Sequence, residues 1–280
     1  MDENRPAYSL HAPATSSAAR AMRLPARREG WPRVDDHLVE PETSRDEMIG
    51  GVRYEASPSD GPHGIQNGEL DYVVRAHVAS GYKVATDLLT RFDEDSDFAS
   101  DTAVLKDGID PDSGTRYLEE IAFEVVSQQN EAKIRRKVPR MLRRGVRRVF
   151  AVFVKKNLAC EWSAERARFE PLDRQALIED PCLGQPLEVE ALLDAAVADD
   201  AVFRALVAKG NPAARKLQDE AVAETKTEAV LTVLEARGLE VTETTRERLL
   251  ATTDLELLDR WLVQAVTAAS AEDLIATDSA

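Results

Sequence analysis

Residues 100–154 read SDTAVLKDGIDPDSGTRYLEEIAFEVVSQQNEAKIRRKVPRMLRRGVRRVFAVFV, and this stretch decides the fold. Three apolar runs within it, Thr102–Leu105, Leu118–Ser127 and Val146–Val154, have the composition and length of β-strands. A helical pattern over Asn130–Arg144, followed by a glycine, separates the last two runs. The order strand, strand, helix, strand predicts an α/β domain with a mixed central sheet flanked by helices.

One carboxylate, Glu124, is set deep in the apolar run Leu118–Ser127. The alternation of a strand makes both faces of this run apolar except at Glu120 and Glu124, so we expect helices to cover both faces. An ionised carboxylate in such a place is costly unless a cation or hydrogen-bond donors hold it. Two interpretations follow: Glu124 forms a structural ion pair, or it is a ligand of a metal site.

The metal interpretation needs partners, and two lie nearby in the sequence. Asp101 opens the preceding strand, and Lys137 lies on the helix that follows Glu124. Two carboxylates from the protein and a phosphate from the substrate are the usual ligands of Mg²⁺, which keeps part of its water shell. A lysine beside them could orient or deprotonate an attacking water and offset charge on the phosphate. Glu120, expected on the same strand face as Glu124, could support this site or hold a second metal.

These residues carry a resemblance to a known family. Asp101, the segment Glu124–Ser127, Lys137 and the pair Gly145-Val146 before an apolar strand resemble the Uma-type family of predicted endonucleases. That family belongs to the restriction-endonuclease-like PD-(D/E)XK superfamily, and the resemblance spans roughly residues 50–172. It implies a restriction-endonuclease-like α/β core that hydrolyses DNA phosphodiester bonds with Mg²⁺, for which Mn²⁺ could substitute.

The resemblance also implies roles. Asp101 matches the aspartate of the motif, Glu124 its second acid and Lys137 a lysine on the following helix, with the carbonyl of Val125 as a further metal ligand. His63 resembles a histidine found at this place in the family, and Glu55 is placed near the metal by the same analogy. The chain departs from the superfamily pattern at Val126, where a strand lysine would lie, so Lys137 must reach in from the helix.

The predicted helix Asn130–Arg144 is densely basic, in a chain whose formal net charge is −15. Its apolar residues recur at helical spacing and predict a face packed on the sheet. Basic side chains beside that face could contact phosphates without reading sequence, and the candidates are Lys133, Arg136, Arg140 and Arg144. An ordinary exposed helix face balanced by acidic residues explains the pattern equally well. Pro139 favours a helix that begins only near Arg136.

The remainder of the chain sets the domain organisation. Residues 1–45, rich in proline, serine, alanine and arginine, predict a disordered tail. Residues 46–189 form the predicted α/β domain, in which 93–100 reads as an acidic loop. Residues 190–280 predict an acidic, all-helical appendage suited to homo-oligomer formation or partner binding.

Three further features bear on location. No apolar run approaches the length of a membrane-spanning helix, and the acidic start does not resemble a secretory signal. The two cysteines, Cys160 and Cys182, have no metal-binding spacing; a disulfide stays open, but a reduced cytoplasmic protein is the simpler interpretation.

The sequence therefore predicts a Mg²⁺-dependent DNA endonuclease with an Asp101–Glu124–Lys137 site. The alternative is a nuclease-fold module that has lost catalysis and binds nucleic acid or a protein partner.

Overall fold

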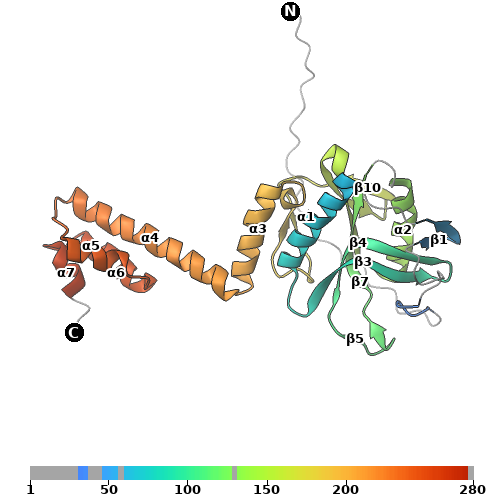
Figure 1. Cartoon of the computed structure of the whole chain (residues 1–280), viewed down its shortest axis with the longest axis horizontal. Helices are drawn as coiled ribbons and strands as arrows, with labels where there is room; N and C mark the ends of the chain where they lie inside the picture. The colour runs from blue at the N-terminus through green and yellow to red at the C-terminus, as the bar shows by residue number, and fades with distance from the viewer. Residues whose placement is uncertain (1–30, 37–45, 56–59, 128–130, 277–280) are drawn as a thin grey trace, which may run out of the picture.

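The computed structural model of the chain describes residues 31–36, 46–55, 60–127 and 131–276. Figure 1 shows an α/β unit from which helices lead away toward the C-terminus. Most of the predicted disordered tail lies outside the described residues. The described part of it, residues 31–36, packs on the sheet: Val34 is buried and its carbonyl accepts a hydrogen bond from the Arg91 N–H at 3.2 Å.

The centre of the α/β unit is an eight-stranded mixed sheet. Its strand order is β10-β9-β8-β7-β4-β1-β2, with β3 also paired to β4. Only β7 and β8 pair in parallel, because helix α2 crosses over between them; the other pairs are antiparallel. The strands are β1 Glu47–Ile49, β2 Val52–Tyr54, β3 Tyr82–Asp93, β4 Ser96–Lys106, β7 Glu119–Val126, β8 Arg148–Phe153, β9 Leu158–Ser163 and β10 Arg168–Pro171.

Two hairpins of two-residue strands stand apart from this sheet. They are β5 Ile109–Asp110 with β6 Thr115–Arg116, and β11 Leu177–Ile178 with β12 Leu187–Glu188. The first lies between β4 and β7 in the chain, where the sequence has its Asp-Gly and Ser-Gly turn residues.

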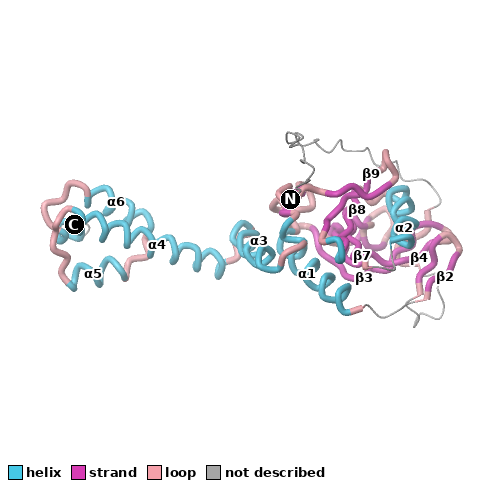
Figure 2. Tube along the Cα trace, turned by 90° about the horizontal axis from the view of Figure 1, so that it is seen from above, coloured by secondary structure: helices cyan, strands magenta, loops and turns pink. Residues whose placement is uncertain are grey.

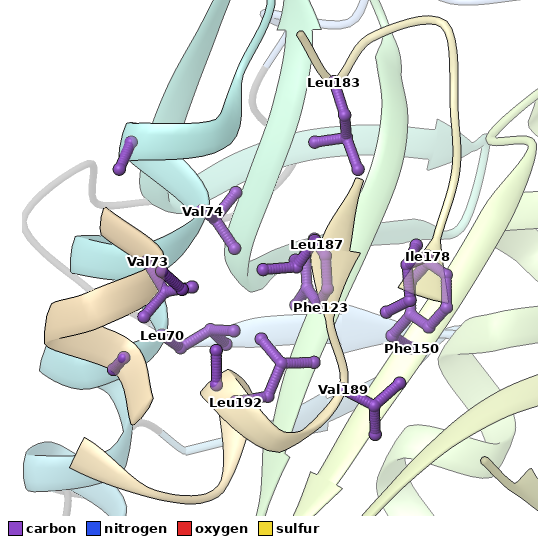
Figure 3. Packing of buried hydrophobic residues seen from close by; sticks show 14 of the residues in the cluster. Leu70, Val73, Val74, Phe123, Phe150, Ile178, Leu183, Leu187, Val189 and Leu192 are labelled. Atoms are coloured by element: carbon purple, nitrogen blue, oxygen red, sulfur yellow. The ribbon is translucent and has the colours of Figure 1, made fainter. Parts of the chain in front are cut away.

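Helices cover both faces of the sheet, as the doubly apolar strand β7 predicts. On one face, Phe123 and Val125 of β7 pack with helix α1 (Gly61–His77), the short helix η2 (Glu190–Leu192) and helix α3 (Ala195–Ala208). Figure 3 shows this cluster, with Leu70 and Val73 of α1 facing Phe123 and Leu192. On the other face, Ala122 and Val126 pack with helix α2 (Glu131–Arg144). The predicted mixed α/β fold with a helix-flanked central sheet is therefore confirmed.

Two local predictions were wrong. Helix α2 begins no later than Glu131 rather than near Arg136, so Pro139 lies in its interior. A proline there costs about 3 kcal/mol, and the burial of Ile134, Val138 and Met141 against the sheet offsets that cost. The expected acidic loop at 93–100 is instead mostly strand, because β4 begins at Ser96 and forms a long hairpin with β3.

The C-terminal part is all helical, as predicted. Helix α4 (Pro212–Ala236) leads away from the α/β unit to α5 (Glu243–Leu250), α6 (Leu255–Ala265) and α7 (Ala271–Ala276), as Figures 1 and 2 show. Trp261 and Leu258 of α6 centre a separate apolar cluster there. The domain boundary at 190 stays a prediction, and α3, which follows it, packs in the same cluster as α1.

Two further features complete the description. Cys160 and Cys182 are free and buried. Among the described residues, no helix is both long and apolar enough to cross a membrane.

The start of helix α3 provides a stability prediction. Asp194 caps this helix by accepting hydrogen bonds from the N–H groups of Ala196 and Val197, at 3.0 and 3.2 Å. An Asp194→Ala change should lower the free energy of unfolding by about 0.5–2 kcal/mol, because two amides lose their acceptor. Urea unfolding measures this, with Asp200→Ala, an exposed site inside the same helix, as the control. Equal effects of the two changes would contradict the assigned cap.

Candidate active site

The candidate site lies at a gap along one edge of strand β4. On that edge, Asp97 pairs with Met48 of β1, and Thr102 pairs with Phe123 of β7. Within the described ranges, no strand covers the edge between these two pairings. Side chains satisfy the backbone there instead: the Ala99 N–H donates to Glu47 Oε1 at 3.0 Å, and the Ala99 carbonyl accepts from Lys137 Nζ at 2.7 Å. The gap thus brings groups from β1, β4, β7 and α2 together.

Glu124 is the most buried acid of the site. Its side chain points to the same face of β7 as Ala122 and Val126, and it therefore faces helix α2. Its Oε2 lies 3.6 Å from Lys137 Nζ, while its Oε1 is buried and has no hydrogen-bond partner. Burial raises the pKa of this carboxyl to about 8, although the nearby Lys137 ammonium opposes the shift. An unpartnered carboxylate oxygen in a dry site is a candidate ligand for a cation.

Asp101 lies on β4 beside Glu124. Its Oδ2 accepts a hydrogen bond from the Val125 N–H at 2.6 Å, and its Oδ1 lies 3.6 Å from His63 Nε2. Burial would raise the pKa of Asp101, but the contact with His63, the charge of Lys137 and the Val125 amide together lower it. Asp101 is therefore held as a carboxylate, in contrast to Glu124.

His63 comes from the first turn of helix α1. The N-cap residue Asp60 accepts its backbone N–H at 2.9 Å, which fixes the start of the helix and directs the ring toward β4. The contact with Asp101 raises the pKa of His63, although burial acts in the opposite direction. His63, predicted only by family resemblance, is thus a direct neighbour of Asp101.

Lys137 reaches the site from α2 and is almost fully buried. Three acceptors surround its ammonium group: the Ala99 carbonyl at 2.7 Å, Glu47 Oε1 at 2.9 Å and Glu124 Oε2 at 3.6 Å. Burial would lower its pKa, but the charges of Glu124, Glu47 and Asp101 raise it above the usual value for lysine. Lys137 is therefore a fixed positive charge.

Sequence reasoning missed Glu47. It lies on β1, where its Oε1 contacts Lys137 and the Ala99 N–H, and its Oε2 pairs with Lys133. The two lysines lower its pKa against the opposing influence of burial. The segment 47–55 reads EMIGGVRYE, a pattern typical of a short hairpin around two glycines, and a carboxylate at the start of its first strand was the available signal. The spacing alone could not connect it to a helix some 90 residues away.

Two other predicted acids lie elsewhere. Glu55 is exposed at the end of β2, away from the buried side chains of the site. Glu120 pairs with Arg147 Nε at 2.5 Å and lies 3.7 Å from Lys106, rather than joining Glu124. The cause is a shift in the β4–β7 register, where Val104 faces Ile121 but Leu105 faces Glu119. A bulge of this kind interrupts the alternation on which the shared face of Glu120 and Glu124 was predicted.

The four basic residues predicted to contact nucleic acid all have partners within the protein. Lys133 pairs with Glu47, and Arg136 donates to the Tyr54 hydroxyl at 2.7 Å. Arg140 donates to Ser96 Oγ at 2.9 Å, and Arg144 donates to the Pro32 carbonyl and stacks on Trp31. Three of these contacts hold the β1–β2 hairpin or the start of β4 onto α2. A phosphate-binding role for these residues stays a prediction.

The residues present fit one divalent metal ion of the Mg²⁺ type. Within the described part of the chain, no three histidine, cysteine or acidic side chains form a ready metal cluster. Two carboxylates with a carbonyl, completed by water and a substrate phosphate, are nevertheless a usual set for Mg²⁺. Asp101 and Glu124 would supply the carboxylates, the unpartnered Oε1 of Glu124 being the best placed, and Val125 the carbonyl. Val126 packs in the α2-side cluster and offers no charge.

The raised pKa of Glu124 predicts how stability depends on pH in metal-free protein. A carboxyl whose pKa is higher in the folded state contributes its full stability at pH values below its pKa in the unfolded state, near 4.5. That contribution is lost as the pH rises from there through about 8. Wild type should therefore become less stable relative to Glu124→Gln across this range. Urea unfolding in EDTA would measure the difference at each pH. A difference that does not vary with pH would contradict the raised pKa.

Comparisons with known proteins add a structural similarity. No family model and no curated protein matches the chain. Among solved structures, the chain is similar to a protein from Anabaena variabilis ATCC 29413 described as "a putative nuclease belonging to DUF820". The TM-score is 0.44 and the sequence identity 15%, over 53% of this chain and 89% of that chain.

Proposed function

We propose that this chain is a Mg²⁺-dependent endonuclease that hydrolyses DNA phosphodiester bonds at the Asp101–Glu124–Lys137 site. The observation that carries the proposal is the buried carboxylate of Glu124. One of its oxygens has no partner, and the other lies 3.6 Å from a buried lysine. An unsatisfied buried polar atom costs about 1–3 kcal/mol, and a bound cation would remove that cost at Glu124.

In this proposal, two acids and a carbonyl hold the metal ion, and a lysine acts on the phosphate and the attacking water. Mg²⁺, when bound, would lower the pKa of a water molecule and offset charge on the phosphate. Asp101, already ionised, and Glu124, after losing its proton, would hold the ion together with the Val125 carbonyl. Lys137 would stabilise negative charge that develops on the phosphate and orient the attacking water. Its raised pKa makes it an electrostatic group rather than a general base.

A second candidate is a nuclease-fold module without catalysis. The observation that favours it is the enclosure of Lys137: its ammonium lies at hydrogen-bond distance from Glu47 and the Ala99 carbonyl and 3.6 Å from Glu124. Two of its three donors are therefore used by the protein, and Glu124 competes with water or phosphate for the third. The endonuclease proposal therefore requires that the substrate or the metal ion replace one of these contacts. The longest of them, the contact to Glu124, is the one expected to break when Glu124 binds a cation.

Plasmid nicking tests the two candidates. Wild type with Mg²⁺ should convert supercoiled DNA to open circles, and EDTA or an Asp101→Asn change should stop the reaction. Glu188→Gln, which alters a surface pair with Arg204 far from the site, is the control and should cleave normally. Cleavage that survives Asp101→Asn would reject this site. A folded wild type that binds DNA without cutting it would favour the second candidate.

A further inference from the structure

Glu47 is the strongest unassigned feature of the molecule. It is a buried acid on the edge hairpin β1–β2, and neither the sequence motif nor the resemblance points to it. The residue is only 8% exposed, and both oxygens of its carboxylate face donors. We infer that Glu47 is the positioning residue for Lys137. This inference rests on the proposed function, in which Lys137 is the active cation.

The distances show which contacts fix the ammonium group. Lys137 Nζ lies 2.9 Å from Glu47 and 2.7 Å from the Ala99 carbonyl, but 3.6 Å from Glu124. Only the first two are hydrogen-bond distances. The position of the ammonium group is therefore set by β1 and β4, and not by the acid that would bind the metal.

Glu47 is itself rigidly held. Its Oε1 also accepts the Ala99 N–H at 3.0 Å, and Lys133 pairs with its Oε2. Glu47 and Lys137 thus bind the two ends of the same residue, Ala99, with a direct contact between them. This closed arrangement is available only because the edge of β4 is uncovered between Asp97 and Thr102.

A lysine needs such contacts to hold its charge in one place. Lys137 carries its ammonium group at the end of a flexible four-carbon chain, and ordering that chain costs rotamer entropy. Glu47 and the Ala99 carbonyl, two acceptors fixed by the sheet, confine the chain.

The test changes the charge of Glu47 and keeps its size. Glu47→Gln retains an oxygen for the Ala99 N–H but weakens the hold on Lys137. We expect kcat for DNA cleavage to fall about 10- to 100-fold, the usual range for residues that orient a reacting group, with little change in KM. Glu131→Gln is the matched control, because it removes an equal charge from an ion pair on α2 with Arg135, and its kcat should stay at the wild-type value.

A second measurement does not depend on activity. A confined lysine ammonium gives a resolved ¹H–¹⁵N NMR signal, which a Lys137→Met variant assigns. This signal should be present in wild type and in Glu131→Gln and absent in a folded Glu47→Gln protein. An unchanged signal in Glu47→Gln, or an unchanged or increased kcat, would overturn the inference; an increase would mean that Glu47 blocks the site. If wild type does not cleave DNA while the signal depends on Glu47, the nuclease proposal fails and the positioning of Lys137 stands.

Discussion

A Glu124→Gln variant should lose Mg²⁺-dependent DNA cleavage by about 10³-fold and keep its fold. Glutamine has the size of glutamic acid, and the carboxyl of Glu124, with its pKa near 8, is largely protonated in the metal-free protein at neutral pH. The change therefore removes little from the folded state without metal. It removes the charge on which the proposed ion depends, so cleavage should fall while the metal-free variant at neutral pH unfolds at the same or a higher urea concentration than wild type.

The same strand provides the matched control. Glu119 is also a fully buried acid of β7 whose pKa is raised by burial and whose Oε2 has no hydrogen-bond partner, but its Oε1 contacts Thr90 and Arg116, outside the site. Glu119→Gln should leave the cleavage rate within about twofold of wild type when the protein is folded. Mg²⁺ titration by calorimetry should show weakened binding only in Glu124→Gln. Equal losses in both variants would mean that the effect comes from disturbing β7 and not from losing a ligand.

Sequence reasoning succeeded where local pattern determines structure. The apolar run around Glu124 predicted a strand covered on both faces, and β7 contributes alternate residues to two separate clusters. The helix between two such runs predicted a crossover, and β7 and β8 are the parallel pair. Asp101, Glu124 and Lys137 follow from their places in these elements, because adjacent strands and the crossover helix bring them to one edge.

The missed features depend on contacts between distant segments. Glu47 enters the site because β1 pairs with the start of β4. This pairing consists of one residue pair, Met48 with Asp97, and the spacing of residues in the sequence does not predict it. Glu120 leaves the expected face because of one shift in register, which alternation cannot foresee. The predicted nucleic-acid-binding residues of α2 turn toward the β1–β2 hairpin, the start of β4 and Pro32 for a similar reason. Their charge was visible in the sequence, but their partners lie 44–112 residues away in the chain.

Replacing Lys137 by methionine should produce the largest stability change of any substitution in the site. Methionine fills a similar volume, so the effect reports the lost charge. Removing one partner of a buried ion pair typically costs about 3–5 kcal/mol, because the remaining charge is buried without compensation. Here two acids, Glu47 and Glu124, lose their common cation.

The loss of stability in Lys137→Met should depend on pH, because Glu124 can take up a proton. Glu47, in contrast, still has its ion pair with Lys133. At about pH 6, Glu124 is protonated, and this limits the loss of stability. At about pH 9, the carboxyl either stays charged without a cation or takes up a proton at a greater free-energy cost. Urea unfolding in EDTA should therefore show a greater destabilisation by Lys137→Met at the higher pH. Adding Glu124→Gln to Lys137→Met should recover much of the loss at pH 9, since no uncompensated charge then remains on β7. A pH-independent loss that Glu124→Gln does not relieve would contradict the electrostatic coupling of these two residues.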